Sequence, residues 1–194
     1  MLQIVIQGRG GQGAQTAGNL LAMAYFEQGA QVQCFASYGG ARRGTPVSSY
    51  LRVDERPVRL RCDIEQPDVI LCFDATLLEG RLLACAQAHS LIVVNSSQDP
   101  AHFARALPGR HVVPIDGLAI ARRHGLGRIV NSALLGGCVR ALHAPPVSGR
   151  LRTPGLDALA QTIAAQAPRH GQANIDACRD GWAAAEQQLA EVAR

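Results

Sequence analysis

The chain has 194 residues, of which 47% are hydrophobic and only 4% aromatic, and its formal net charge is +4. This length suits one α/β domain spanning residues 1–194, with a core of Ala, Leu, Val and Ile. All 19 basic residues are arginine, which excludes Schiff-base chemistry and Walker-type phosphate binding, since both need lysine. The arginines form no basic stripe, so we expect no nucleic-acid partner.

The chain begins with an apolar run, a glycine-rich turn and a helical pattern. Residues 2–6 predict a strand, and Gly8, Gly10 and Gly13 have the G-x-G-x-x-G spacing, with a helix starting near Gln12. The free N–H groups and positive dipole end of such a helix favour an anion. In the alternative, the glycines only allow close packing. The candidate cofactor-binding residues are Gly8, Gly10, Gly11, Gln12, Gly13 and Thr16.

A dinucleotide site needs a second feature, which is an acidic residue at the end of the second strand. That strand is predicted at residues 31–36, and no Asp or Glu occurs between Glu27 and Asp54. Arg42 and Arg43 could meet an NADP phosphate, but they lie inside a long glycine-rich loop. The sequence therefore disfavours NAD(P) as the ligand.

The central part of the chain reads as strands. Residues 47–53 alternate, and residues 56–62 alternate again, which predicts a β-hairpin between them. Continuous apolar runs predict buried strands at residues 67–74, 90–95 and 111–116.

Helices are expected between and after these strands. Thr76 and Glu79 have the spacing of a capping box that opens a helix running to about His89. Asn131 is the expected N-cap of a later helix. The further helices are predicted at residues 116–124, 132–143, from Thr153–Pro154 onward, and 174–193.

This alternation predicts a Rossmann-like, mostly parallel α/β sheet with helices on both faces and a β-hairpin extension. Ligands of such sheets gather beyond the carboxyl ends of the strands. The loops at 7–13, 36–46, 74–76 and 95–99 should therefore share one edge, which is the candidate site. Asp74 would lie there, where helix capping is favoured over an acid/base role.

Metal sites and membrane segments are not predicted. The six cysteines are at least ten residues apart without a C-x-x-C pair, and the histidines lack ligand spacing, so we expect no metal or iron–sulfur cluster in this chain. Cys34 and Cys72 should be buried thiols. The first strand starts at Met1, which leaves no room for a signal peptide, and no run is long enough to span a membrane. A cytoplasmic location is expected.

Four segments together resemble a known family. "GRGGQGAQTAGNLLA", "SYGGARRGTPVSSYLRV", "PDVILCFDATLL" and "NSALLGG" are similar to the gamma subunit of the 2-oxoacid:acceptor oxidoreductases. These thiamine-dependent enzymes act on pyruvate, 2-oxoglutarate, branched-chain or aryl 2-oxoacids, phenylglyoxylate and indolepyruvate among them. The resemblance spans most of the chain, and the pairing of G-x-G-G-Q-G-x-x-T with S-Y-G-x-x-x-R-G is its most specific part.

The resemblance implies a chain that is inactive alone and assigns it no catalytic residue. Alpha, beta and delta-type partner subunits would hold thiamine diphosphate, magnesium and iron–sulfur clusters, and coenzyme A would be the co-substrate. The implied reaction is oxidative decarboxylation of a 2-oxoacid to an acyl-CoA, with electrons passing to ferredoxin or to a NAD-reducing flavin subunit. A stand-alone nucleotide- or CoA-binding module and an NAD(P)-dependent oxidoreductase are the alternatives.

The second loop of the resemblance is the expected contact with substrate, CoA or a partner. Arg43 matches the Arg-Gly position of the family, whereas Ala41 stands where the family often has glutamate, so any role of that carboxylate is lost. A diphosphate, a CoA phosphate or a substrate carboxylate would suit the arginines, as would carboxylates or carbonyls of a partner subunit. The candidate residues are Ser37, Tyr38, Gly39, Arg42, Arg43 and Gly44.

Overall fold

The protein forms a six-stranded sheet, shown by a computed structural model that describes residues 1–38, 44–149, 151–167 and 170–192. The strand order is β2-β3-β1-β4-β5-β6. Strands β1, β4, β5 and β6 are parallel, and β3 is antiparallel to both β1 and β2, so β3 alone is reversed. The strands are β1 (Leu2–Arg9), β2 (Gln31–Tyr38), β3 (Pro46–Asp54), β4 (Val69–Cys72), β5 (Leu91–Asn95) and β6 (His111–Ile115).

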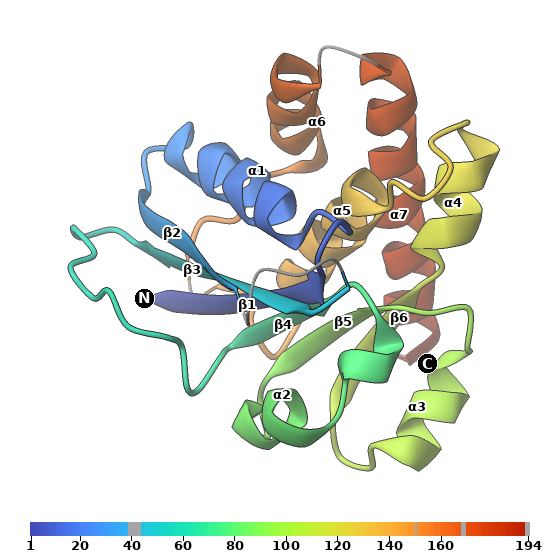
Figure 1. Ribbon diagram of the computed structural model, residues 1–194, viewed down its shortest axis with the longest axis horizontal. Coiled ribbons are helices and arrows are strands. Elements are labelled where there is room, and N and C mark those ends of the chain that lie inside the picture. The colour runs from blue at the N-terminus through green and yellow to red at the C-terminus, as the bar shows by residue number, and fades with distance from the viewer. Residues whose placement is uncertain (39–43, 150, 168–169, 193–194) are drawn as a thin grey trace.

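Helices cover both faces of this sheet (Figure 1), which confirms the predicted fold class. Two buried clusters, one on each face, form the core. One face carries α1 (Ala14–Phe26), α4 (Gly117–Arg123), α5 (Asn131–Leu142), α6 (Leu156–Gln166) and α7 (Gly171–Val192). The other carries the short 3-10 turn η1 (Ala75–Leu77), α2 (Gly80–Cys85) and α3 (Pro100–Ala106).

Three glycines allow α5 to pack directly on its neighbours. A Cβ at Gly136 would lie 1.9 Å from the carbonyl oxygen of Cys178 in α7, and one at Gly181 would lie 1.9 Å from that of Ala133. A Cβ at Gly137 would lie 2.8 Å from Ile115 of β6. The "NSALLGG" segment is thus the place where α5 meets the backbone of α7 and the Ile115 side chain of the sheet.

The predicted hairpin is wrong. Residues 56–62 form no strand, and β3 pairs instead with β2 and β1. Because β2 and β1 occupy both edges of β3, no edge is left for a strand at residues 56–62. Arg52, which is only 2% exposed, donates to the carbonyl oxygens of Cys62 at 2.8 Å and Asp63 at 3.2 Å. This side chain satisfies the two carbonyl groups at the end of the segment, and Ile64 packs into the core.

Helix boundaries differ from the prediction at three places. The Thr76–Glu79 capping box does not form, because Asp74 caps η1 and Glu79 makes no side-chain cap to α2, which already ends at Cys85. Asn131 is the first helical residue of α5, and Val130 is the N-cap. Helix α1 begins at Ala14, slightly later than expected.

Helix α3 is an addition to the prediction, although its sequence carries a start signal. The Asp99 carboxylate accepts from the His102 N–H at 2.7 Å, and Pro100 occupies the first turn. In the part of the chain that the structure describes, no helix combines the length and apolar character needed to cross a membrane.

Candidate functional site

The glycine-rich turn lies at the carboxyl end of β1, where the second predicted loop meets it. The Gly10 N–H donates to the Thr45 carbonyl at 2.9 Å, and the Gly44 N–H donates back to Gly10 at 3.3 Å. The turn then enters α1 through Gly11 and Gly13, whose φ angles of 94° and 87° are left-handed and favour glycine. Two loops expected on one edge are therefore joined by backbone hydrogen bonds.

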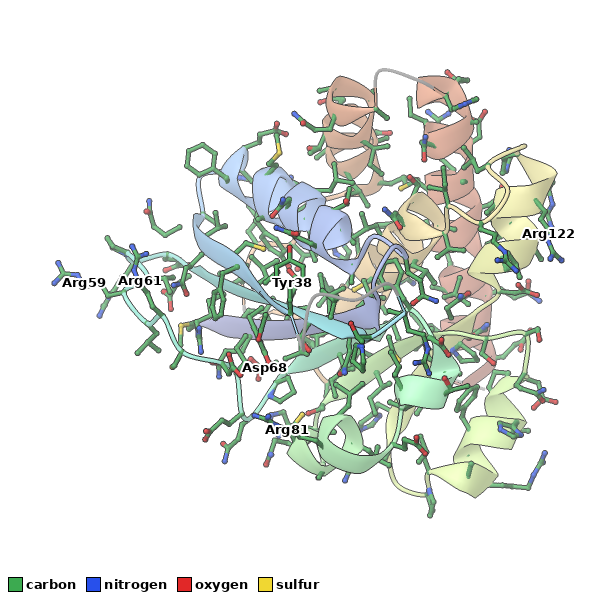
Figure 2. All side chains as sticks on the ribbon, viewed as in Figure 1. Tyr38, Arg59, Arg61, Asp68, Arg81 and Arg122 are labelled. Atoms are coloured by element: carbon green, nitrogen blue, oxygen red, sulfur yellow. The ribbon has the colours of Figure 1, made fainter. Side chains whose placement is uncertain are left out.

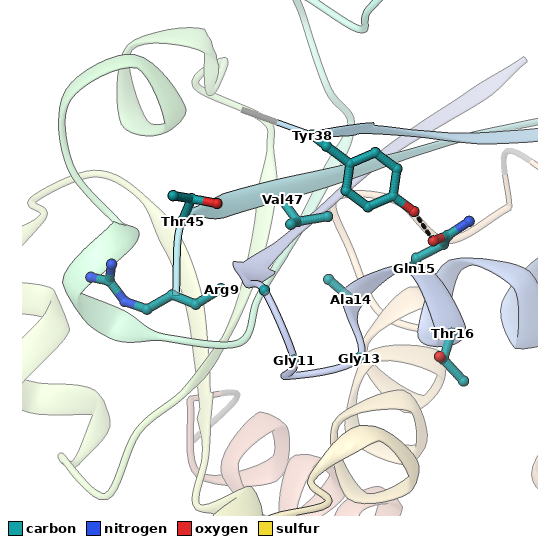
Figure 3. Close-up of a pocket in the computed structure, with 10 residues that line it drawn as sticks. Arg9, Gly11, Gly13, Ala14, Gln15, Thr16, Tyr38, Thr45 and Val47 are labelled. Atoms are coloured by element: carbon teal, nitrogen blue, oxygen red, sulfur yellow. Dashed lines mark hydrogen bonds between the residues drawn. The ribbon is translucent and has the colours of Figure 1, made fainter. Parts of the chain in front are cut away.

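A pocket of about 750 Å³ opens over this turn (Figure 3). We call it the loop pocket. Its wall includes the start of α1, where the first N–H groups have no intrahelical acceptor, and the helical ladder begins with Ala17 donating to Gly13. The Tyr38 hydroxyl closes one side by donating to Gln15. The lining residues are Arg9, Gly10, Gly11, Gly13, Ala14, Gln15, Thr16, Tyr38, Thr45 and Val47.

Among the described residues of the pocket wall, the positive charge comes mainly from the N-terminus of α1. Arg9 is the one charged side chain among these lining residues, and its guanidinium is ion-paired with Asp74 at 2.7 Å. The N-terminus of α1 carries partial positive charge, which falls off within the first turn. An anion of the pocket would therefore contact backbone N–H groups and the Thr16 hydroxyl rather than a free cation of the described wall.

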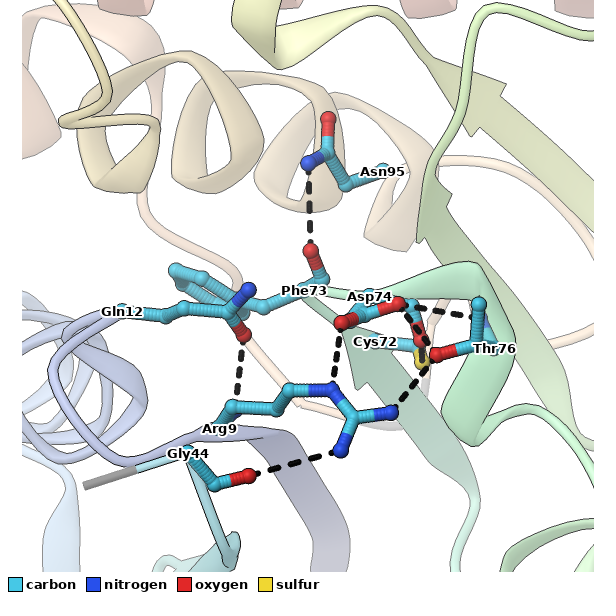
Figure 4. Close-up of polar contacts among 8 residues, drawn as sticks. All are labelled: Arg9, Gln12, Gly44, Cys72, Phe73, Asp74, Thr76 and Asn95. Atoms are coloured by element: carbon cyan, nitrogen blue, oxygen red, sulfur yellow. Dashed lines mark hydrogen bonds and ion pairs between the residues drawn. The ribbon is translucent and has the colours of Figure 1, made fainter.

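Arg9 bridges the two loops that leave β1 and β4 (Figure 4). Its guanidinium donates to Asp74, to the Thr76 hydroxyl at 2.8 Å and to the Gly44 carbonyl at 3.4 Å. The connections after β1 and β4 run to opposite faces of the sheet, which makes this crevice the switch point where open α/β sheets bind ligands. Here the ion pair between Arg9 and Asp74 bridges that crevice and holds the ends of β1 and β4 together beside the loop pocket.

Asp74 is a capping and ion-pairing residue, as favoured from the sequence. Its carboxylate accepts from the Thr76 N–H at 3.1 Å and from the Thr76 hydroxyl at 2.6 Å, in addition to Arg9. Burial raises the pKa of the Asp74 carboxyl, but the hydrogen bonds from Thr76 and Arg9 lower it by more, so its pKa lies below the ordinary range. A carboxylate that holds no proton at neutral pH is a poor general acid.

Replacing Asp74 with asparagine should change how stability depends on pH. The folded-state pKa is lowered, so the wild-type carboxylate contributes stability above its unfolded pKa of about 3.9, and this contribution is lost as pH falls through the folded value. We expect wild type to have the higher melting temperature at pH 7 and the difference to shrink toward pH 3. A constant difference between wild type and Asp74→Asn across that range would contradict the assignment.

The structure divides the predicted site residues. Ser37 and Tyr38 are neighbours on β2, so their side chains point to opposite faces of the sheet: Tyr38 lines the loop pocket and Ser37 lines another hollow. Gly8 is a packing position, since a Cβ there would lie 3.1 Å from Phe73. Gln12 lies beside a separate hollow of about 460 Å³. Gly39, Arg42 and Arg43 lie outside the described residues.

Sequence reasoning missed four residues of this region: Arg9, Gln15, Thr45 and Asn131. Arg9 and Gln15 stand inside the glycine-rich motif itself, which was the available signal. Asn131 lies in the "NSALLGG" segment, and a Cβ at Gly13 would lie 2.4 Å from its amide nitrogen. The start of α5 therefore supports the start of α1.

The strand order also bears on the dinucleotide alternative. In a dinucleotide-binding unit the strand that follows the first helix lies next to the first strand and brings its acidic residue to the ribose. In this protein β3 separates β2 from β1, and the backbone that reaches the turn is that of Gly44 and Thr45. The geometry therefore disfavours NAD(P), in agreement with the missing acidic residue.

A doubly covered, mostly parallel sheet with a glycine-rich pocket at its carboxyl edge defines the class: an α/β domain of Rossmann-like type. Comparison with known proteins narrows this class. Residues 3–184 match the pyruvate ferredoxin/flavodoxin oxidoreductase family, and the chain belongs to it.

Individual relatives are gamma-type subunits. The chain is 36% identical over 145 residues to the pyruvate/ketoisovalerate oxidoreductases common subunit gamma of Thermococcus kodakarensis, covering 73% of this chain and 78% of that one. It is 38% identical over 137 residues to pyruvate synthase subunit PorC of Methanosarcina barkeri, covering 70% and 75%. The crystal structure of pyruvate oxidoreductase subunit PORC from Thermotoga maritima superposes with a TM-score of 0.76 at 31% identity, over 94% and 95% of the two chains.

Proposed function

We propose that residues 1–194 are one gamma-type domain, a subunit of a thiamine diphosphate-dependent 2-oxoacid oxidoreductase, and that the loop pocket receives a phosphate-bearing part of coenzyme A. The assembly would convert a 2-oxoacid to an acyl-CoA and pass the electrons to ferredoxin or a NAD-reducing flavin subunit. The observation that carries the proposal is the pocket of about 750 Å³ at the start of α1, in a chain of this family. Backbone N–H groups at a helix start suit phosphate oxygens.

The cofactors of the reaction would be held by alpha, beta and delta-type partner subunits. Thiamine diphosphate with magnesium supplies the decarboxylation chemistry, and iron–sulfur clusters supply electron transfer. Among the described residues, no group of three or more His, Cys, Asp or Glu is placed to hold a metal ion.

Three of the cysteines are buried thiols. Burial raises the pKa of the Cys138 and Cys178 thiols to about 12 and that of Cys72 to about 11, so without a metal they are protonated at neutral pH.

Purification of the native assembly through a tag on this chain tests the proposal. Thiamine-dependent and iron–sulfur-containing chains should co-purify, and the assembly should oxidise one of a panel of 2-oxoacids with coenzyme A and an electron acceptor. The chain alone should show no such activity. A chain that purifies alone from its host and binds a nucleotide unaided would instead support a stand-alone binding module.

Replacing Gln15 with glutamate should weaken coenzyme A binding without weakening the fold. Gln15 lines the loop pocket in the first turn of α1, and a glutamate there keeps the size and can still accept from Tyr38. Its negative charge would repel a bound phosphate by about 1–2 kcal/mol at ~5 Å in a partly solvated site. We expect the KM for coenzyme A to rise about tenfold in the assembly.

Asn19→Asp is the matched control. It adds the same charge on an exposed position of α1 one turn further from the pocket. Its KM for coenzyme A should stay near the wild-type value, and the thermal stability of both variants should be close to wild type. If Gln15→Glu and Asn19→Asp have equal KM values, the phosphate does not bind at the start of α1.

A further inference from the structure

An arginine-bearing loop projects from the end of the sheet opposite the loop pocket. It follows β3, whose last residue Asp54 pairs with Gln31 at the first position of β2. The side chains of Arg56, Arg59 and Arg61 are exposed, and Figure 2 shows Arg59 and Arg61 pointing away from the rest of the ribbon. In the part of the chain that the structure describes, no ion pair involves any of these three guanidinium groups. We call this loop, residues 55–61, the arginine loop.

The arginine loop is anchored at both ends. At its start, the Arg56 N–H donates to the Asp54 carboxylate at 3.1 Å. Just beyond its end, the buried Arg52 holds the carbonyl oxygens of Cys62 and Asp63, and Ile64 is 5% exposed in the core. An anchored loop loses less conformational entropy on binding than a free one, so it is a good docking element.

Apolar side chains are exposed at the same end of the molecule. Leu60 lies between two of the arginines and is 49% exposed. Phe26 ends α1 at this edge, just before β2, and is 64% exposed. Arginine combined with exposed aromatic and aliphatic groups is the composition of protein interfaces, where arginines and aromatics dominate the binding energy. Phosphate contacts of nucleic acids do not require such apolar neighbours.

We propose that the surface formed by Arg56, Arg59, Leu60 and Arg61 docks an acidic surface of another subunit of the assembly. This inference rests on the proposed function, and it names where that assembly holds this chain. The partner surface carries carboxylates that face the three guanidinium groups and an apolar depression for Leu60. Because the docking surface lies at the amino edge of the sheet, the loop pocket at the carboxyl edge stays open.

Reconstitution of the assembly tests the docking surface. The remaining subunits, purified together without this chain, are titrated onto immobilised full-length chain at increasing NaCl concentrations. For the triple variant Arg56→Ala/Arg59→Ala/Arg61→Ala we expect the dissociation constant at low salt to rise at least about tenfold and its salt dependence to become shallower. Leu60→Ser should weaken binding while leaving the salt dependence unchanged.

The control is Arg105→Ala/Arg128→Ala/Arg152→Ala, which removes equal charge from other exposed positions. Its dissociation constant should stay within about twofold of wild type. Equal binding by the two triple variants would overturn the docking surface while the proposed function stands. No binding even by wild-type chain would overturn both. If the arginine loop instead governs retention of RNA, and nuclease removes the effect, the surface is not a protein-docking site.

Discussion

The variant Gly181→Ala should yield little folded protein. Its new Cβ would stand 1.9 Å from the carbonyl oxygen of Ala133, which belongs to the backbone of α5 and cannot rotate away. Helices α5 and α7 would have to separate, and Leu134, Cys138 and Ala185, all fully buried, would lose their packing. We expect a loss of at least about 4 kcal/mol, comparable to the whole stability of many domains. Gly136→Ala, opposite the Cys178 carbonyl, should behave alike.

Gly171→Ala, also in α7, is the control that separates the clash at Gly181 from the general effect of replacing glycine with alanine in a helix. A Cβ at Gly171 has nothing within 4 Å, and alanine favours the helix, so this variant should equal or exceed wild type in stability by up to about 1 kcal/mol. Urea denaturation of the three variants, with soluble yield, measures the difference. Similar midpoints for Gly171→Ala and Gly181→Ala would show that α5 and α7 are not in backbone contact.

Replacing Gly13 with alanine should have the second largest effect, because two costs combine. The φ angle of 87° strains any residue with a Cβ by about 1–2 kcal/mol. In addition, the Cβ would lie 2.4–2.9 Å from the amide group of Asn131, which must then move. We expect a total loss of about 2–4 kcal/mol on thermal or urea denaturation. The displaced turn should also raise the KM for coenzyme A in the assembly.

A double-mutant cycle with Asn131→Ala separates the cost of the backbone strain from the cost of the contact with Asn131. Shortening Asn131 removes the contact but leaves the strain of the left-handed backbone, so Gly13→Ala should cost only about 1–2 kcal/mol in that background. The same cost in both backgrounds would show that Asn131 does not buttress the turn. The cycle thereby tests whether the starts of α1 and α5 form one unit.

The strands that are buried on both faces could be predicted from the sequence, whereas the structure of residues 56–62 could not. Residues 69–72 and 91–94 are continuous apolar runs, as a parallel strand buried on both faces requires. Residues 56–62 alternate just as well as a true strand, so pattern alone could not reject them. What decides their structure is that β2 and β1 already occupy both edges of β3, and no local pattern shows which strands become neighbours.

The same distinction holds for the candidate site: features set by neighbouring residues could be predicted, and contacts between distant residues could not. The turn at Gly10, Gly11 and Gly13 follows from spacing within one motif, and it lies where predicted. The Arg9–Asp74 pair joins residues 65 positions apart in sequence, so it depends on which strands become neighbours. The separation of Ser37 from Tyr38 was readable, because adjacent residues of a strand face opposite sides.

The close contact of α5 with α7 has a consequence for how the protein is made. The chain leaves the ribosome amino end first, so the sheet and α5 emerge well before α7. Until α7 has left the exit tunnel, the glycine-lined face of α5 is exposed to water and the larger buried cluster is incomplete. We therefore expect the core on this face to close only after α7 has been synthesised.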